Sequence, residues 1–403
     1  MLIEKTEDSI FSVIEKRGIN MLEYQRLIAE IDLDAIENNV IEIKKRLDPK
    51  TRMLAVVKAD GYGHGAVEVS KICLYNGADW LGIATCEEGA ALREANIPVP
   101  ILILGYTVEN QLESVIEHRL TQAVFSYEMA ELVSKTAVRM NKTAEIHIKI
   151  DTGMGRIGFL PCEESLKTID KIFTLPNIKV TGIFTHFSTA DETDKTFTKT
   201  QFERFLYMTD GLEKMGHTGL IRHCANSGAI IDLPEMQLDM VRAGIILYGM
   251  MPSTEVGDMK LKPAMSLKTH VSYVKEVDAD TPIGYGRTFY TEKPSKIATI
   301  PIGYADGYSR QYSNRARVIV NGEYANVVGN VCMDQAMLDV THIKDIKMGD
   351  EVTVMGICGD KSVSAEELAG ISNTINYEIV CNVGKRVPRV YIRNGQMLKV
   401  TVL

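Results

Sequence analysis

Short apolar runs alternate with amphipathic segments along the first part of the chain. The runs have the length and composition of strands that are buried on both faces, as in parallel sheets. Eight of them are found, at residues 52–58, 80–85, 100–105, 122–126, 144–151, 180–187, 220–226 and 241–248. Segments with helical periodicity lie between them, among them 66–76, 87–95 and 198–215. Eight strand–helix repeats predict an α/β fold, a closed (β/α)8 TIM barrel rather than an open doubly wound sheet.

The pattern changes after residue 255, where helical periodicity gives way to short alternating strands. Glycine-containing turns such as Asn321-Gly322 and Asn394-Gly395 separate these strands, as in β-hairpins. The strands are expected at 271–277, 296–302, 317–321, 324–330, 335–340, 351–357, 389–393 and 397–402. This pattern predicts a C-terminal, mainly antiparallel β domain.

The two patterns divide the chain into three predicted parts. Residues 1–27 form an N-terminal extension with helical periodicity, residues 28–255 form the barrel, and residues 256–403 form the β domain. The strand 28–33 precedes the first barrel repeat and is a candidate to pair with the β domain.

Composition narrows the class of protein. The chain has 403 residues, of which 45% are hydrophobic, so it has enough apolar material for two domains. A net charge of -8 and the lack of a basic stripe argue against nucleic-acid binding. The apolar runs are too short for a membrane helix, and the first residues do not resemble a secretory signal, so we expect a cytoplasmic protein. The seven cysteines show no CxxC pairing, and no metal site is predicted.

Lys58 stands at the end of the first barrel strand. Gly61, Gly63 and Gly65 follow it and allow a sharp turn. Catalytic groups of barrel enzymes lie at this end of the strands, and a lysine in apolar surroundings loses its proton readily and can form a Schiff base. The alternative is a surface lysine that happens to follow a core strand.

Other polar residues also follow predicted strands, and gathered at one rim they would form an active site. They are Lys149, Asp151, Arg156, His186, Asn226, Ser227 and Arg242. Each has a structural alternative: His186 as a buried hydrogen-bonded histidine, Arg156 as the partner of a surface acid, and Ser227 as a helix N-cap. Their joint occurrence at strand ends favours a site.

Five ordered motifs make the chain resemble one family. KADGYGHG, KIDTGMGRIGF, VRAGIILYG, IGYGRTF and NVCMDQAMLDVT are similar to the signatures of bacterial alanine racemases. The resemblance runs from about Ala29 to Leu403. It implies a pyridoxal 5'-phosphate (PLP) isomerase that interconverts L- and D-alanine and supplies D-alanine for peptidoglycan. The alternatives are a serine or broad-specificity racemase of the same architecture, and a non-catalytic PLP-binding protein.

The resemblance also implies how the cofactor is held. Lys58 would bind PLP covalently, and the phosphate would be bound at Tyr62, Ser227, Gly244, Ile245 and Tyr377. The turn at Asn226-Ser227 and the amides at Gly244-Ile245 offer hydrogen-bond donors of the kind that bind a dianion.

Racemisation needs acid–base groups on both faces of the cofactor, because the hydrogen leaves Cα on one side and returns on the other. By the resemblance, Tyr285 deprotonates the L-isomer and Lys58 the D-isomer. The alternative for Tyr285 is a turn residue on the surface of the β domain. In the family a head-to-tail homodimer shares its sites, so Tyr285 and Met333 would come from the partner subunit, Met333 through its backbone amide near the substrate carboxylate.

The remaining roles follow from the same resemblance. Arg242 would face the pyridine nitrogen, which a permanently charged guanidinium keeps unprotonated, and His186 would hydrogen-bond Arg242. Lys149 stands where the family often has a carbamylated lysine. The carbamate would orient Arg156, and Arg156 would contact the cofactor and the substrate carboxylate.

The resemblance also implies roles in substrate choice and access for three positions of the second domain. Tyr377 stands where related serine racemases carry a smaller amide residue, which favours alanine. Tyr304 and Arg310 would line the entry corridor to the site, and the alternative for both is a surface loop.

Overall fold

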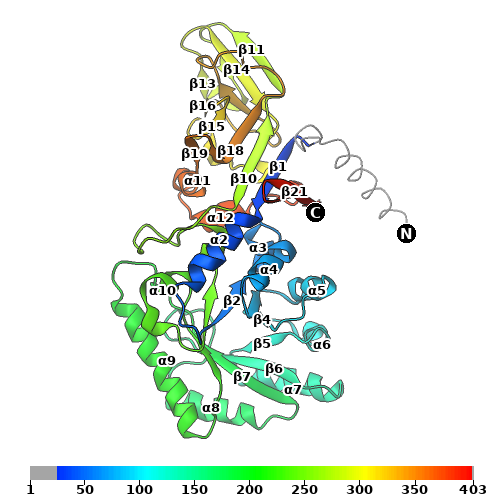
Figure 1. Ribbon diagram of the computed structural model, residues 1–403, viewed down its shortest axis with the longest axis vertical. Helices are drawn as coiled ribbons and strands as arrows, with labels where there is room; N and C mark the ends of the chain where they lie inside the picture. The colour runs from blue at the N-terminus through cyan, green and yellow to red at the C-terminus, as the bar shows by residue number, and fades with distance from the viewer. Residues whose placement is uncertain (1–24, 402–403) are drawn as a thin grey trace, which may run out of the picture. The chain divides into compact units, whose positions relative to one another are not determined.

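A computed structural model describes residues 25–401, which form two compact units (Figure 1). We call residues Leu33–Pro263 the barrel unit. The β unit combines the described residues up to Asp32 with those from Ala264 onward. Residues 1–24 of the predicted helical extension lie outside the described residues.

The barrel unit contains a parallel sheet of eight strands in the order β8-β7-β6-β5-β4-β3-β2-β9. Its strands are β2 (Arg52–Val56), β3 (Trp80–Ile83), β4 (Ile101–Ile103), β5 (Thr121–Val124), β6 (Ala144–Lys149), β7 (Ile178–Phe184), β8 (Ile221–His223) and β9 (Met240–Ala243). At the remaining gap, the amide of Arg242 donates to the carbonyl of Ala225 over 2.9 Å, so the sheet is nearly closed. The predicted barrel is confirmed.

Helices cover the outside of this sheet (Figure 1). They bury one apolar stripe each, as in α8, where Leu166, Ile169 and Ile172 are the buried residues. The main helices are α2 (Leu33–Lys44), α4 (Ala66–Tyr75), α5 (Cys86–Glu94), α6 (Leu112–Glu117), α7 (Tyr127–Arg139), α8 (Glu163–Phe173), α9 (Thr196–Lys214) and α10 (Ser227–Asp232). The predicted helices at 66–76, 87–95 and 198–215 correspond to α4, α5 and α9.

The β unit is built on a sheet of eleven strands. Its strands are β1 (Leu27–Asp32), β10 (Met265–His270), β11 (Tyr273–Val277), β14 (Ser295–Ile300), β15 (Arg317–Val320), β16 (Glu323–Val327), β17 (Ala336–Asp339), β18 (Glu351–Cys358), β19 (Lys361–Val363), β20 (Arg389–Arg393) and β21 (Gln396–Thr401). Strand β1 pairs antiparallel with β10 and parallel with β20, and the other ladders of the sheet are antiparallel. The predicted mainly antiparallel domain is confirmed.

Some elements differ from the prediction. The strand expected at 241–248 ends at Ala243, and the buried run Ile245–Tyr248 forms the 3-10 helix η4. A short apolar run does not distinguish a buried strand from a buried helical turn by periodicity. The two units divide at Pro263–Ala264, whereas the sequence predicted a boundary at residue 255.

The β unit also contains helical elements that the sequence did not reveal. Helices α11 (Ala365–Ser372) and α12 (Asn376–Cys381) follow β19, and a small second sheet pairs β12 (Pro282–Ile283) with β13 (Phe289–Tyr290). Ser364 caps α11 by accepting a hydrogen bond from the amide of Glu367. These elements position two of the predicted site residues, Tyr377 in α12 and Tyr285 between β12 and β13.

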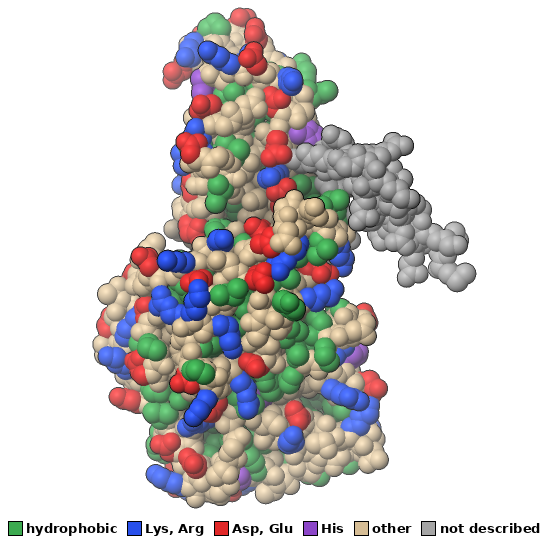
Figure 2. All heavy atoms as spheres, in the orientation of Figure 1, with side chains coloured by type: hydrophobic (Ala, Val, Ile, Leu, Met, Phe, Trp, Pro, Cys, Tyr) green, Lys and Arg blue, Asp and Glu red, His purple; other side chains and the backbone are tan. Residues whose placement is uncertain are grey.

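Acidic and basic side chains are interspersed on the face shown in Figure 2. Among residues 25–401, no helix combines the length and the apolar character that a membrane crossing requires.

Candidate active site

The predicted site residues of the barrel unit all lie at or just beyond the C-terminal ends of its strands. Lys58 follows β2, Lys149 ends β6, and Arg242 lies in β9. Asn226 and Ser227 follow β8, and His186 follows β7. Parallel strands present their C-terminal ends at one rim, so the fold gathers these side chains there.

Lys58 opens a left-handed turn. Ala59, Asp60, Gly61 and Tyr62 all have positive φ, between 51° and 60°. Only the glycine adopts this conformation without steric cost, and the other three each store roughly 1–2 kcal/mol. The sequence pointed to a glycine turn here but not to positive φ at three residues with side chains. Backbone strain of this kind is concentrated at functional sites.

Two carboxylates hold the strained turn. Asp60 Oδ1 accepts a hydrogen bond from the amide of Ala66 over 2.9 Å, which closes the turn onto α4. Glu88 Oε1 accepts from the amide of Ala59 over 2.6 Å, and its Oε2 accepts from the amide of Ala84 over 2.7 Å. Glu88 therefore ties the residue after Lys58 to the end of the neighbouring strand β3.

Three polar groups converge beside this turn. Ser227 Oγ accepts a hydrogen bond from the amide of Gly244 over 3.1 Å. A Cβ placed on Gly244 would lie 3.2 Å from Tyr62 Oη, which is a tight contact, and 3.5 Å from Ser227 Oγ, which is an ordinary one, so a side chain here would crowd the Tyr62 hydroxyl. Asn226 caps α10 through a 3.2 Å bond from the amide of Ala229, and the amide of Ile245 begins η4. The arrangement is a small cradle of hydroxyls and backbone donors, which suits an anion.

Arg242 is the buried cation of the barrel. Its Nη1 donates to the carbonyl and to Nδ1 of His223, both over 3.0 Å. Its Nη2 donates to the carbonyls of Thr185 over 2.7 Å and Cys224 over 3.1 Å, and to His186 Nδ1 over 3.1 Å. No ion pair joins an acid to Arg242 within residues 25–401. Burial lowers its pKa to about 10, so the guanidinium stays charged at neutral pH.

A line of histidines continues from Arg242 into the barrel core. His223 Nε2 lies 2.9 Å from His147 Nδ1, and the His223 ring stacks on Phe184. Because Arg242 has only donors to offer, Nδ1 of His223 accepts, its Nε2 carries the proton, and His147 Nδ1 accepts in turn. Gly182 leaves room for this line, since a Cβ there would lie 2.6–2.8 Å from the His147 ring.

Sequence reasoning missed His147 and His223, although both stand in barrel strands. Burial and the nearby Arg242 charge lower the pKa of His147 to about 3. The same two causes hold the pKa values of His186 and His223 well below the ordinary range. All three imidazoles are therefore neutral near pH 7.

Lys149 is almost fully buried next to this charge. Burial, reinforced by Arg242, lowers its pKa to about 7, and its Nζ donates to the carbonyl of Ile150 over 2.7 Å. The following loop wraps around the Asp151 carboxylate, which accepts from the amides of Gly153, Gly155 and Arg156 over 3.0–3.1 Å. The Arg156 side chain is exposed, and no hydrogen bond joins it to Lys149 among the described residues.

The β unit presents the second group of predicted residues. Tyr285 lies between Gly284 and Gly286, which both have positive φ, and its side chain is 70% exposed. Its carbonyl accepts a 2.6 Å hydrogen bond from Asn330 Nδ2, which fixes the turn to the loop before Met333. The glycines thus hold the phenol outside the packed interior.

Met333, Tyr304 and Arg310 lie around the same loop. Met333 is 53% and Tyr304 is 44% exposed. The amide of Tyr304 donates to the carbonyl of Cys332, and Arg310 Nη1 donates to the carbonyl of Val331. Tyr377 stands apart from this loop, in the first turn of α12, and is half-buried. The structure therefore brings together Tyr285, Met333, Tyr304 and Arg310 within the β unit.

The histidine line predicts a specific proton arrangement. With ¹⁵N-labelled histidine, we expect the imidazoles of His147, His186 and His223 to remain neutral from pH 8 to pH 5, with the proton on Nε2. Burial and the Arg242 charge hold their folded-state pKa values below the ordinary range of histidine, so lowering the pH through that range adds no proton. The check is ¹⁵N NMR with each signal assigned by a single His→Gln substitution, and a His223 signal that becomes protonated above pH 5 would contradict the arrangement.

Comparisons with known proteins agree with these two units. The family model for the alanine racemase N-terminal domain matches residues 31–252, and that for the alanine racemase C-terminal domain matches residues 264–391. An alanine racemase of Clostridium perfringens is 52% identical over 374 residues, which cover 92% of this chain and 97% of that protein.

Solved structures give the same result. The alanine racemase of Clostridium difficile 630 has a TM-score of 0.90 and 42% identity, covering 94% of this chain and 98% of that chain. The alanine racemase of Bartonella henselae, solved with covalently bound pyridoxal phosphate, has a TM-score of 0.82 and 30% identity, covering 91% of this chain and 100% of that chain. The chain described here belongs to the alanine racemase family.

Proposed function

We propose that this protein interconverts L- and D-alanine with PLP as its cofactor. The observation that carries the proposal is the set of groups at the barrel rim. Lys58 begins a strained turn, and the hydroxyls and backbone donors that suit an anion lie beside it. Arg242 is buried at the same rim without an acid partner among residues 25–401. When bound, PLP supplies the electron sink that makes the Cα–H bond of an attached amino acid acidic. The protein's residues must hold the cofactor, orient the amino acid and move the proton.

The barrel residues fit this cofactor. Lys58 would hold it covalently, and the hydroxyls of Tyr62 and Ser227 with the amides of Gly244 and Ile245 would bind its phosphate. The fit rests on Gly244, where even a methyl group would crowd the Tyr62 hydroxyl and contact Ser227 Oγ. Tyr377 and Asn226 complete the proposed phosphate site, Tyr377 through its phenol and Asn226 by fixing the start of α10.

Arg242 would meet the pyridine nitrogen. Its five hydrogen bonds use Nη1 and Nη2, and none of those found among the described residues uses Nε. The guanidinium cannot accept a proton, so it disfavours a protonated ring and weakens the electron sink. A carboxylate in its place would do the opposite. His186 holds Nη2 from the side and would line the ring.

Two side chains would move the proton. Lys58 Nζ would exchange it on the face of D-alanine and Tyr285 Oη on the face of L-alanine, as acid–base groups on opposite sides of Cα. We propose that Tyr285 and Met333 come from the second subunit of a head-to-tail homodimer. Their exposure in the β unit supports this, since a donated side chain must protrude from its own subunit.

The substrate carboxylate would be bound by Arg156 and by the amide of Met333. The Met333 carbonyl already accepts from the amide of Ala305, whereas its N–H makes no hydrogen bond among the described residues. Tyr304 and Arg310 would line the entrance on the same side.

Alanine is favoured over serine as the substrate. Relatives about half identical to this chain over most of its length are named alanine racemases, and Tyr377 would keep the pocket small. A hydrophobic pocket rejects an added hydroxyl only weakly, so serine would be a slow substrate. The chain also has the β unit with an exposed Tyr285, which argues against the alternative of a non-catalytic PLP-binding protein.

We place the enzyme in the cytoplasm, where its D-alanine would supply peptidoglycan precursors. The seven cysteines are all free thiols, which is typical of a reducing compartment.

Tyr285→Phe tests the two-sided proton transfer. We expect racemisation to fall by at least about 100-fold, because one of the two acid–base groups is removed. Exchange of the Cα hydrogen of D-alanine with deuterated buffer should fall far less, because Lys58 remains. Cα exchange and optical rotation, followed with L-alanine, D-alanine and L-serine, provide the measurement.

The matched control for this substitution is Tyr290→Phe, an exposed tyrosine of the neighbouring strand β13. It should retain wild-type rates. Racemisation by Tyr285→Phe at the control's rate would refute the proposed role of the phenol.

Mixed dimers test whether the sites are shared. A Lys58→Ala chain paired with a Tyr285→Phe chain should form one native site, because Lys58 of the second chain meets Tyr285 of the first. We expect about half the wild-type activity per dimer from chains purified with two different tags. The control pairs a wild-type chain with one carrying both substitutions, and it should be as inactive as the single variants. Activity in the control and not in the first pair would show that each chain uses its own Tyr285.

Lys149 carbamylation is the third test. A buried amine with a pKa of about 7 is largely neutral at pH 8, so it can add to CO2 and release a proton, giving an anionic carbamate beside Arg242 and Arg156. We expect a ¹³C NMR carbamate signal with labelled bicarbonate at pH 8 that disappears in Lys149→Met. It should persist in Lys167→Met, where an exposed lysine is removed. Lack of the signal in the wild type would contradict the modification.

A further inference from the structure

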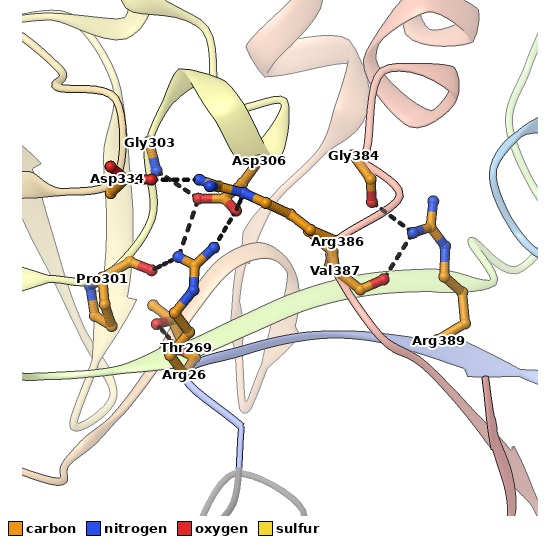
Figure 3. Close-up of polar contacts among 10 residues, drawn as sticks. All are labelled: Arg26, Thr269, Pro301, Gly303, Asp306, Asp334, Gly384, Arg386, Val387 and Arg389. Atoms are coloured by element: carbon orange, nitrogen blue, oxygen red, sulfur yellow. Dashed lines mark hydrogen bonds and ion pairs between the residues drawn. The ribbon is translucent and has the colours of Figure 1, made fainter. Parts of the chain in front are cut away.

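Asp306 is a fully buried carboxylate in the β unit, and its side chain has 0% exposure. Arg26 approaches one side of it, with Nη2 2.5 Å from Oδ1 and Nη1 3.2 Å from Oδ2 (Figure 3). Arg386 approaches another side, with Nε 2.7 Å from Oδ1. The amide of Gly303 donates to Oδ2 over 3.0 Å. The Asp306 carboxylate thus accepts four hydrogen bonds, three from two guanidinium groups and one from a backbone amide.

The Asp306 carboxylate stays charged in this setting. Burial alone would raise its pKa, but the hydrogen bonds from Arg26, Arg386 and the Gly303 amide outweigh it and hold the pKa below the ordinary value. Charge-assisted hydrogen bonds of this geometry are about twice as strong as neutral ones. The segment that carries Asp306 is therefore held firmly.

That segment is the 3-10 turn η6 (Tyr304–Asp306), and it is locked to the loop of Met333. The amides of Tyr304 and Ala305 donate to the carbonyls of Cys332 and Met333, each over 3.0 Å. A Cβ on Gly303 would lie 2.3 Å from both of these carbonyl oxygens, so the two backbones are in direct contact. Any movement of Asp306 is transmitted to Met333.

Arg386 reinforces the link from the other side. Its Nη2 donates over 2.6 Å to Oδ1 of Asp334, the residue after Met333 (Figure 3). The amide of Gly384 donates to the carbonyl of Asp306 over 2.9 Å. The guanidinium of Arg386 therefore bridges the turn of Tyr304 and the loop of Met333 through two different carboxylates.

We propose that Asp306, held by Arg26 and Arg386, is a positioning residue that sets the place of the Met333 amide and of Tyr304 for the active site of the partner subunit. This rests on the proposed function, in which Met333 contacts the substrate carboxylate. Asp306 touches neither substrate nor cofactor and acts through the backbone of residues 303–306 and 332–334. We expect its effect to fall on substrate binding more than on proton transfer, because the turn of Tyr304 bonds to Cys332 and Met333, whereas Tyr285 is tied to Asn330 earlier in the same loop.

Asp306→Asn keeps the shape of the side chain and removes its charge. We expect KM for both alanine enantiomers to rise about tenfold, as losing charge-assisted hydrogen bonds at one position implies, with kcat changed less than about threefold. A loss of binding that is equal in the ground state and the transition state appears in KM alone. Arg386→Gln should shift KM in the same direction by a smaller factor. Because the Arg386 side chain is half-exposed, this variant should disturb folding less than Asp306→Asn does.

The matched control is Glu367→Gln, which breaks another arginine–carboxylate pair of the β unit. Arg317 donates to both oxygens of Glu367 over 2.8 and 3.0 Å, and neither residue touches the turn of Tyr304 or the loop of Met333 by a hydrogen bond. KM should be unchanged. An equal rise of KM in Glu367→Gln and Asp306→Asn would reduce Asp306 to a general structural role and overturn the proposal.

Mixed dimers give a readout that a general structural role would not move. In a dimer of Lys58→Ala with Asp306→Asn, the competent barrel belongs to the Asp306→Asn chain but receives Met333 from a chain with native Asp306, so KM should be native. In a dimer of wild type with a chain carrying both substitutions, the competent barrel receives the altered loop, so KM should be raised. The reverse result would show that Asp306 acts within its own chain.

The pair of Lys58→Ala with Tyr285→Phe separates the two hypotheses. If that pair regains activity, the shared site stands, and an unchanged KM in the Asp306→Asn homodimer then refutes the positioning role alone. If that pair stays inactive while the singly altered chains fold, the shared site itself fails.

Discussion

The arrangement of the barrel rim depends on burying one guanidinium that forms no ion pair with an acid in the part of the chain that the structure describes. Arg242 is surrounded by carbonyls from Thr185, His223 and Cys224 and by two imidazole nitrogens. A buried charge is tolerated only when its donors are satisfied, so β7, β8 and β9 must end at positions that supply these acceptors. Strands β8 and β9 come together where the barrel nearly closes, and there the carbonyls of His223 and Cys224 accept hydrogen bonds from Arg242.

The same charge sets the protonation of its neighbours. Burial, reinforced by this charge, holds the pKa values of the imidazoles below their ordinary range and lowers the pKa of the Lys149 amine to about 7. A carboxylate beside Arg242 would oppose the part of each shift that the charge contributes, while the larger part that burial contributes would remain. The Arg242 charge therefore bears on the chemistry proposed for the cofactor ring and, after burial, on the reactivity proposed for Lys149.

The sequence was sufficient for the fold class because apolar runs and turn residues are local signals. It placed the barrel strands within a few residues of their positions in the structure. It also placed the turns next to Lys58 and Tyr285, because glycines such as Gly61 and Gly284 are typical of sharp turns. It was insufficient where burial decides the conformation, as at η4, where the apolar run Ile245–Tyr248 was predicted as strand. Helices α11 and α12 were missed for a related reason, because each is short and stands between strands.

The residues of the candidate site also fall into those that local sequence signals predict and those that they do not. Residues at strand ends could be predicted from the sequence, because the barrel topology states where strand ends meet. His147, His223 and Asp306 could not, because their roles depend on partners far away in the sequence, such as Arg26 for Asp306. Asp306 lies two residues after Tyr304, but nothing in the local sequence distinguishes a buried, multiply bonded acid from a solvent-exposed one. The roles assigned to Lys58 and Tyr285 stay predictions until the experiments are done.

The two units use buried charge in opposite ways, and this difference has a physical consequence. In the β unit an anion is surrounded by two cations, so Asp306 is fully compensated and the loops it holds need no ligand to be stable. In the barrel unit Arg242 is held by hydrogen bonds at Nη1 and Nη2 but forms no ion pair with an acid among the described residues, and the Lys149 amine lies nearby. An anion at the rim would relieve this imbalance, whether it is the proposed phosphate, a substrate carboxylate or a carbamate on Lys149. The free energy of that compensation would stabilise a loaded barrel over an empty one. The β unit is thus built to present a fixed surface, and the barrel unit is built to be completed by what it binds.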